Sequence, residues 1–249
     1  MIDFHCHVDL FPDPAELVAE ITRRRCYVLA VTTTPLAWAG TNRVVGDAPR
    51  VKVGLGLHPE LVEQRHEEVD EFGRLLPQAR YVGEIGIDGS ARHRSSFDLQ
   101  RRVFRKVLRL TAEAGGRIMS IHSRGAATSV LDEIEQHPEA GTAVLHWFSG
   151  TLGELRRASE LGCWFSVGPA MLRTKKGRRL LEEMPPDRVL TESDGPFTQD
   201  QGGPIVPWGL RSAIRVLGEV WTLSENDVQG QLKRNLKSLV GGPAHDALQ

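Results

Sequence analysis

The chain opens with the segment Ile2-Asp3-Phe4-His5-Cys6-His7, a short apolar run that ends in two histidines one residue apart. The run is typical of a buried β-strand, which we expect over Ile2–His5. Alternate residues of a strand point the same way, so the rings of His5 and His7 can face one metal ion. Cys6 then points to the opposite side, where we expect it to pack rather than to bind metal.

Seven further apolar runs of this kind follow along the chain. The full set of expected strands is Ile2–His5, Tyr27–Thr32, Val51–Leu57, Tyr81–Ile87, Ile118–His122, Ala143–His146, Cys163–Val167 and Val189–Thr191. They are rich in Val, Ile and Leu without clean alternation, which favours parallel strands buried on both faces. Amphipathic stretches lie between them, the clearest over Phe97–Ala114, with Ser95 or Ser96 to cap its start and Gly115-Gly116 to end it.

Eight strands that alternate with helices over 249 residues predict an α/β fold, a single (β/α)8 TIM-type barrel. No linker, low-complexity block or close repeat divides the chain, so we expect one domain over residues 1–249. A doubly wound open sheet is the alternative, although no Gly-x-Gly-x-x-Gly motif follows the first strand.

The composition limits the classes of partner. Lys and Arg number 31 against 32 Asp and Glu, a net charge of −1, whereas domains that wrap nucleic acid non-specifically usually carry a basic excess. Any nucleic-acid contact must then come from a local patch and from bound metal. Three scattered cysteines suggest no disulfide framework, and neither a signal-peptide pattern nor a membrane-spanning apolar run is present. We therefore expect a cytoplasmic protein with no membrane partner.

Histidines and carboxylates recur at or after the ends of the expected strands. They are His5, His7, His58, Glu84, His122, His146 and Asp194. In a (β/α)8 barrel the C-terminal strand ends form one mouth, where active sites lie, so these residues would converge. A single core histidine is more often hydrogen-bonded than metal-bound. So many imidazoles and carboxylates at one mouth, however, would be costly to bury without a cation.

The same residues lie in segments that resemble the TatD family of metal-dependent deoxyribonucleases, within the wider amidohydrolase-like barrels. The segments are IDFHCH (2–7), GLHP (56–59), GEIGID (83–88), Gln100 to Phe104, IHSR (121–124), HWFSG (146–150), TESDGP (191–196) and Asn235-Leu236. They occur in the family's order over nearly the whole chain, so the resemblance is specific, although His-x-His alone would be weak.

The resemblance implies a centre of two divalent metal ions. One would be held by His5, His7 and Asp194, the second by His122 and His146, and Glu84 would bridge the two. Imidazole and carboxylate ligands suit Zn²⁺ or Mn²⁺, and open positions also admit Mg²⁺. Asp194 would also take the proton of the attacking water, so Asp194 and Glu84 are the expected catalytic residues.

Other residues near the strand ends have two interpretations each. His58 can hydrogen-bond the scissile phosphate or hold the turn before Pro59. Arg124 can grip phosphate through its planar fork or pair with a neighbouring carboxylate. Asp88 and Glu192 can support a further metal or orient the ligands by hydrogen bonds. Trp147 can stack on a base or simply pack.

A basic segment, Arg173–Arg179, follows the seventh strand and contains Lys175 and Lys176. It can track a nucleic-acid backbone near the mouth, or it can be a solvated helix face. Two features depart from the usual TatD pattern. Gly89 stands where an aromatic residue commonly follows, and the loop Phe197–Pro207 is unlike the family's usual continuation. Both would border the substrate groove.

The stretches Ser166–Met171 and Thr191–Phe197 resemble QatD, the TatD-type nucleases of Qat anti-phage systems, which implies work beside other Qat proteins. The primary hypothesis is a deoxyribonuclease. Its expected substrates are single-stranded DNA or frayed ends, which it would cleave as an exonuclease. One alternative is a two-metal hydrolase of a small amide, lactone or phosphoester. The other is a metal-bound, non-catalytic subunit of a defence complex, against which the complete ligand set argues.

Overall fold

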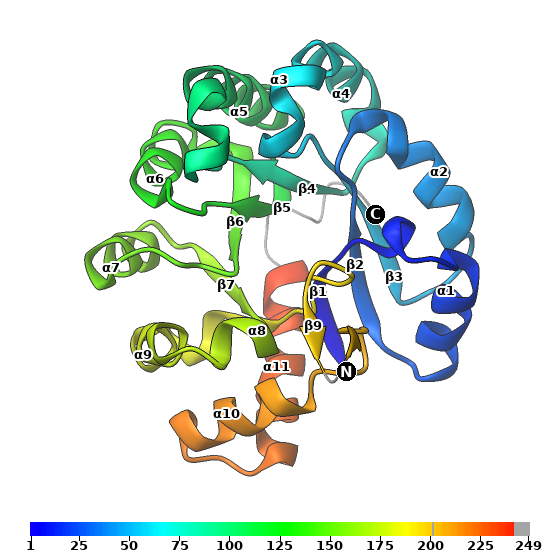
Figure 1. Ribbon diagram of the computed structural model, residues 1–249, viewed down its shortest axis with the longest axis vertical. Coiled ribbons are helices and arrows are strands. Elements are labelled where there is room, and N and C mark those ends of the chain that lie inside the picture. The colour runs from blue at the N-terminus through cyan, green and yellow to red at the C-terminus, as the bar shows by residue number, and fades with distance from the viewer. Residues whose placement is uncertain (201, 242–249) are drawn as a thin grey trace.

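The computed structural model describes residues 1–200 and 202–241 and has eight parallel strands at its centre (Figure 1). The strands are β1 (Ile2–Cys6), β2 (Tyr27–Val31), β3 (Val51–Leu55), β4 (Tyr81–Gly86), β5 (Arg117–His122), β6 (Gly141–His146), β7 (Trp164–Val167) and β8 (Val189–Thr191). Their spatial order equals their order in the chain. All eight expected strands are therefore confirmed, with ends that differ by at most two residues.

Helices surround the strands on the outside (Figure 1). They are α1 (Pro14–Arg23), α2 (Pro35–Val45), α3 (Val62–Arg65), α4 (Val69–Leu75), α5 (Phe97–Glu113), α6 (Ala127–Gln136), α7 (Leu152–Glu160), α8 (Pro169–Leu172), α9 (Lys175–Glu183), α10 (Arg211–Trp221) and α11 (Glu225–Val240). A short hairpin of β9 (Gln199–Asp200) and β10 (Gly203–Pro204) follows β8. The barrel is thus confirmed and the open doubly wound sheet is wrong. Residues 201 and 242–249 of the expected domain lie outside the described part.

Helix α5 is the expected helix and shows how its ends form. Ser96 lies at the N-cap position, but its hydroxyl donates to the His93 carbonyl (3.1 Å) instead of capping a helix N–H. At the other end Gly115 and Gly116 adopt φ values of 84° and 77°, and their N–H groups donate back to Ala112 and Thr111. Left-handed glycines end the helix, as the sequence predicts.

The three cysteines of the chain, Cys6, Cys26 and Cys163, are free and buried. Cys6 lies in an apolar cluster between the barrel and its helices with Val18 and Ile21, which confirms its packing role. Among the described helices none is long and apolar enough to cross a lipid bilayer.

The seam between β8 and β1 is closed by a buried carboxylate. Within the described residues the strand ladder runs from β1 to β8 without a direct β8–β1 ladder. Asp3 instead accepts hydrogen bonds from the Ser193 N–H (2.8 Å) and hydroxyl (2.6 Å), and burial raises its pKa to about 7. The Asp194 N–H donates to the His5 carbonyl at 2.9 Å. This seam therefore sets Asp194 directly beside His5.

Close backbone approach between β4 and β5 depends on a glycine. Gly86 has φ 137°, and a Cβ built there would lie 2.1 Å from the His122 carbonyl oxygen. No side chain fits at that distance without a shift of backbone. The packing of His122 against β4 therefore requires glycine at position 86.

We expect Gly86→Ala to destabilise the protein by at least about 1 kcal/mol, or roughly 2–4 °C in Tm, because both the φ angle and the space exclude a methyl group. Thermal unfolding monitored by circular dichroism measures the change. Gly153→Ala in α7 is the matched control, since its Cβ would meet nothing closer than 3.9 Å. Equal Tm values for Gly86→Ala and the unsubstituted protein would contradict this packing argument.

Candidate metal centre

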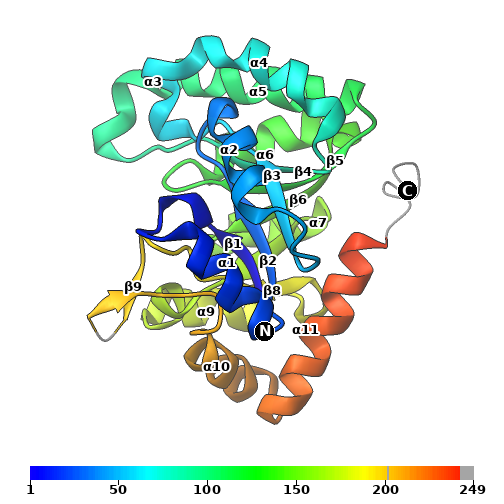
Figure 2. The same cartoon turned by 90° about the vertical axis from the view of Figure 1, so that its right-hand side faces the viewer.

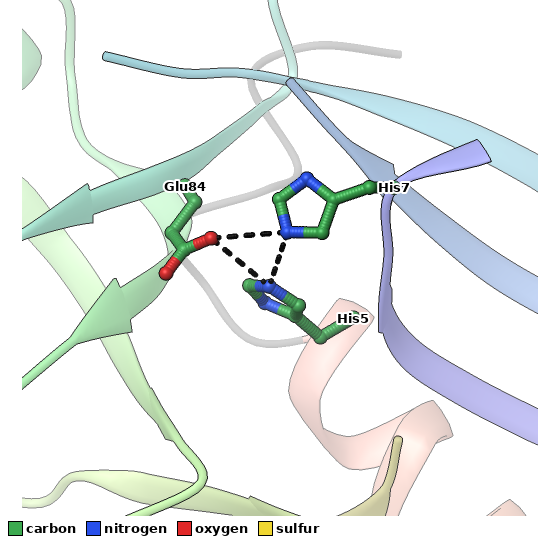
Figure 3. A group of neighbouring side chains, drawn as sticks. All are labelled: His5, His7 and Glu84. Carbon is green, nitrogen blue, oxygen red and sulfur yellow. Dashed lines mark hydrogen bonds and ion pairs between the residues drawn. The ribbon is translucent and has the colours of Figure 1, made fainter. Parts of the chain in front are cut away.

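Glu84 lies at the centre of the mouth formed by the C-terminal strand ends, and it is 1% exposed. One of its carboxylate oxygens, Oε2, faces His5 in β1 and His7 directly after it (Figure 3). It lies 3.2 Å from His5 Nε2 and 3.1 Å from His7 Nε2, and these two nitrogens are 3.3 Å apart. Asp194 Oδ1 lies 3.8 Å from each of the same nitrogens. The His-x-His pair thus faces one point, as the alternation along β1 predicts.

The other carboxylate oxygen of Glu84, Oε1, faces three more imidazoles. It lies 2.9 Å from His122 Nδ1, 3.0 Å from His146 Nε2 and 3.1 Å from His58 Nε2. These rings come from the end of β5, the end of β6 and the loop after β3. The two oxygens of one buried side chain therefore separate two groups of ligand atoms.

The number of imidazoles around Glu84 exceeds what hydrogen bonding explains. Five ring nitrogens lie within 3.2 Å of its two oxygens, whereas an ionised carboxylate has about four lone-pair sites. The Nδ1 atoms of His7 and His146 are also buried without a hydrogen-bond partner among the described residues. Neutral imidazole nitrogens and carboxylate oxygens are metal ligands, so this set fits divalent cations.

Three-residue groups within the cluster are close enough to hold an ion. They are His5, His7 and Glu84; His58, Glu84 and His122; and His5, His146 and Glu192, each with ligand atoms within 4.8 Å of one another. Glu84 belongs to two of these groups, one on each side of its carboxylate. These groups contain every residue expected to bind metal except Asp194, which lies beside them, with its Oδ1 atom 3.8 Å from His5 Nε2 and His7 Nε2.

The buried charges shift one another's protonation. Burial acts to raise the pKa of Glu84, but the surrounding imidazoles hold it well below its usual range. Burial and the proximity of His146 lower the pKa of His5, whose ring stacks on that of His146 at 3.9 Å. Burial acts to lower the pKa of His146, but the carboxylates of Glu84 and Glu192 raise it well above its usual value. Burial raises the pKa of Asp194 to about 8, with His146 opposing the shift and Glu84 adding to it.

Asp88 and Glu192 lie behind the histidines. Asp88 Oδ2 lies 2.8 Å from His122 Nε2, the nitrogen opposite the one that faces Glu84. Glu192 accepts from the Trp147 N–H (3.0 Å) and from the Ser166 hydroxyl, and it lies 3.7 Å from His146 Nδ1. Ser120, which the sequence did not single out, contacts His5 Nδ1 at 2.7 Å. This placement resembles the outer partners that orient metal-bound imidazoles.

A cavity of about 500 Å³ opens over the cluster. Its lining comprises His7, His58, Glu60, Glu84, His122, Ser123, Arg124, His146, Trp147, Ser149, Asp194 and Phe197. Three of the expected substrate-binding residues, His58, Arg124 and Trp147, therefore lie in its wall. Within the described chain no carboxylate pairs with Arg124, and His58 Nδ1 accepts a hydrogen bond from the Glu60 N–H (3.1 Å).

The basic segment after β7 is only partly free. Arg173 pairs with Asp200 of the hairpin (3.0 Å), and Arg178 and Arg179 pair with glutamates on the outer surface. Lys176 donates to the carbonyl of Ser149, which lines the cavity, so it lies at the rim. Lys175 precedes it at the start of α9 and is exposed, outside the cavity lining.

Three lining residues were not given a role by the sequence: Glu60, Ser123 and Ser149. A fourth, Phe197, begins the loop that was expected to border the substrate groove, and it does line the cavity. Phe197 is 62% exposed, and its ring meets the His7 ring edge-on at 4.9 Å. Its position directly after the TESDGP segment was the available signal. Gly89 also has a structural reason, because its Cβ would lie 2.2 Å from the Gly125 carbonyl oxygen. An aromatic residue does not fit there with the neighbouring loop in this position.

Comparison with known proteins adds independent information. A family model described as TatD related DNase matches residues 2–241. The uncharacterized metal-dependent hydrolase YjjV of Escherichia coli (strain K12) is 26% identical over 257 residues, which cover 97% of this chain and 98% of that protein. A crystal structure of the Escherichia coli TatD homolog YjjV shares the fold, with a TM-score of 0.86 at 24% identity over 98% of each chain.

A further relative has a nuclease name. The 3'-5' ssDNA/RNA exonuclease TatD of Pantoea vagans (strain C9-1) is 30% identical over 149 residues, which cover 57% of this chain and 56% of that protein.

We expect Asp88→Asn to weaken divalent-cation binding by the cluster about 10–100-fold, because His122 loses the negative partner of its outer nitrogen. Isothermal titration with Mn²⁺ or Zn²⁺ measures the affinity. Asp98→Asn, the same change at an exposed position in the first turn of α5, is the control. If both variants bind metal as tightly as the unsubstituted protein, Asp88 does not orient a ligand.

Proposed function

The chain belongs to the TatD-related DNase family of metal-dependent hydrolases, and on that premise we propose that it is a two-metal phosphodiesterase that degrades DNA. The observation that carries the proposal is the position of Glu84, whose two oxygens each face a separate group of imidazoles. A carboxylate between two groups of ligands could hold two ions close together, as two-metal hydrolysis of phosphodiesters uses them. The proposed catalytic domain spans residues 1–249.

The proposed ligands follow the two sides of Glu84. The first ion would be held by His5, His7 and Asp194 and the second by His122 and His146, with Glu84 available to both. Mg²⁺, Mn²⁺ or Zn²⁺ suits this donor set. When bound, the two ions supply a water of lowered pKa and neutralise the charge that develops on the phosphate.

Asp194 is the proposed general base. Its carboxylate lies at the floor of the cavity, 8% exposed, next to the His5 and His7 nitrogens. The Asp194 N–H is held by the His5 carbonyl, so the side chain is positioned by the β1–β8 seam. Burial raises the pKa of this carboxyl to about 8, and the charge of bound cations would favour its ionised form, which could then accept the proton of the attacking water.

The remaining wall residues bind the substrate in this proposal. Arg124 grips a phosphate through its guanidinium, and His58 donates a hydrogen bond to a phosphate oxygen. Trp147 stacks on a terminal base, since aromatic stacking tolerates every base. Lys175 and Lys176 contact the backbone of the strand as it leaves the rim. Asp88 and Glu192 orient His122 and His146.

The cavity favours strand ends as the substrate. It encloses about 500 Å³, which is a suitable size for one small group rather than for a duplex. Removal of nucleotides from single-stranded or frayed DNA ends fits this space, and one relative is named an exonuclease of single-stranded DNA and RNA.

The setting of this activity is part of the proposal. The resemblance of Ser166–Met171 and Thr191–Phe197 to QatD supports work in the cytoplasm beside other Qat anti-phage proteins. The three buried free cysteines are compatible with a reducing compartment. Plaque assays test the defence role. The cells express the other Qat proteins together with this chain, either unsubstituted or carrying Asp194→Asn. Equal phage protection by both would contradict a catalytic role in defence.

A second candidate, hydrolysis of a small amide, lactone or phosphoester, is favoured by the same cavity volume. Two-metal centres on this fold perform such chemistry as well, so the fold does not choose between them. The complete set of ligand residues argues against a third candidate, a non-catalytic subunit.

Degradation of end-labelled single-stranded DNA tests the nuclease. After chelation, we expect added Mg²⁺, Mn²⁺ or Zn²⁺ to restore cleavage, and Asp194→Asn to reduce it about 10²–10⁴-fold through loss of the base. Asp187→Asn, the same change at an exposed position before β8, should cleave normally. The order in which products appear gives the polarity.

Two outcomes separate the candidates. Inactivity of the metal-loaded protein toward single-stranded, double-stranded and frayed DNA, together with turnover of a small ester or amide, would establish the second candidate. Equal cleavage by Asp194→Asn and the unsubstituted protein would remove Asp194 from the mechanism.

A further inference from the structure

A second large cavity lies at the opposite end of the barrel from the metal cluster. It encloses about 570 Å³ and is lined by the first residues of β1 to β4 together with α11. Figure 2 shows α11 on one side of the molecule and, on the other, the β9 hairpin that comes after β8 in the chain. The N-terminal strand ends of such barrels normally serve stability alone. A cavity of this size there is therefore unexpected.

The wall of this cavity is strongly basic. Its cationic residues are Arg50, Lys52, Arg80, Lys233, Arg234 and Lys237. Within residues 1–200 and 202–241 none of them pairs with a carboxylate. Some cations elsewhere on the surface do have such partners; Arg101 and Arg105, for example, share Glu133. Six unpaired cations around one cavity, in a chain with a net charge of −1, repel one another and favour an anion between them.

The acidic content of the lining does not offset this charge. Asp3 is the acidic residue in the lining, and it is completely buried beneath the cavity surface. Its oxygens are taken up by the N–H and hydroxyl of Ser193 and by the His5 N–H. Asp3 is therefore committed to the β1–β8 seam and leaves the wall positive.

The floor of the cavity is apolar. It is formed by Phe4, Leu29, Tyr81, Leu236 and Val240. Tyr27 stands at the edge with 41% of its surface exposed, and the Arg50 guanidinium lies 5.2 Å from the centre of its ring. A ring of cations over an apolar and aromatic floor is complementary to a molecule with a flat apolar part and an anionic part.

We propose that this cavity is a binding site for a small phosphorylated ligand with an aromatic ring, of the nucleotide class. A solvated basic patch would not account for the apolar residues between the cations. A long polyanion would not be accommodated in a cavity whose volume suits one small molecule. The site is separate from the metal cluster, so the inference stands independently of the nuclease activity.

Binding of deoxyadenosine monophosphate, measured by isothermal titration calorimetry on the full chain, tests the site. The decisive variant carries Lys52→Gln, Arg80→Gln and Lys237→Gln, three exposed changes that remove charge and keep length. We expect it to lose at least about tenfold in affinity, the effect of one lost charge-assisted hydrogen bond. Deoxyadenosine and inorganic phosphate, each with half of the recognised groups, should bind more weakly than the nucleotide.

The control variant carries Arg74→Gln, Arg102→Gln and Arg109→Gln, three exposed cations outside both cavities, and should keep the binding lost by the first variant. Equal affinity of the Lys52, Arg80 and Lys237 variant and the unsubstituted protein would overturn the proposal. So would an equal loss in the control variant, or no nucleotide binding at about 1 mM.

Photo-crosslinking keeps the test valid if a variant folds poorly. With 8-azido-deoxyadenosine monophosphate and the unsubstituted chain, a labelled peptide from β2 or α11 supports the site. Labelling confined to the peptides that contain Trp147 or Phe197 contradicts it.

Discussion

The structure depends on the burial of one carboxylate among five imidazoles. Glu84 is almost inaccessible to water, yet ring nitrogens from four strands or their loops lie within 3.2 Å of it. Such a cluster is costly to bury unless charge and lone pairs are balanced. The barrel resolves this by convergence, because the ends of its parallel strands surround one axis. Two cations, one on each side of Glu84, would turn the same crowding into favourable ligation.

Hydrogen bonds from neighbouring side chains hold the cluster in place. The Asp3–Ser193 contacts fix β8 against β1 and thereby set Asp194 beside His5. Asp88 holds the outer nitrogen of His122, and Ser120 that of His5. Asp3 and Ser120 lie in strands, and Asp88 and Ser193 lie within two residues of a strand end, so the partners of the ligands are positioned by the barrel strands and the residues directly after them. The substrate wall differs, since Arg124, Trp147 and Phe197 come from the connecting loops. The two ends of the barrel also differ: the candidate metal cluster lies at one end and the basic cavity at the other.

Much of this arrangement could be predicted from the sequence. Apolar runs of three to seven residues predicted all eight strands, and the residues at their ends, among them His122 and His146, do converge. These features follow from local periodicity and from one rule of barrel geometry. The contact of His122 Nδ1 with Glu84 could not be predicted, because it depends on the side-chain rotamer. The Arg173–Asp200 pair and the contact of Phe197 with His7 could not be predicted either, because they depend on loop conformation. The basic cavity was missed because its residues, such as Lys52 and Lys237, meet only when α11 packs against the strand starts.

The most direct test of the central claim is a crystal structure of the Mn²⁺-loaded protein with anomalous diffraction data. We expect two anomalous peaks roughly 3.5–4 Å apart, one beside His5 and His7 and one beside His122 and His146, with Glu84 in contact with both. A single peak, or two peaks without Glu84 between them, would contradict the account of Glu84 as the bridging ligand.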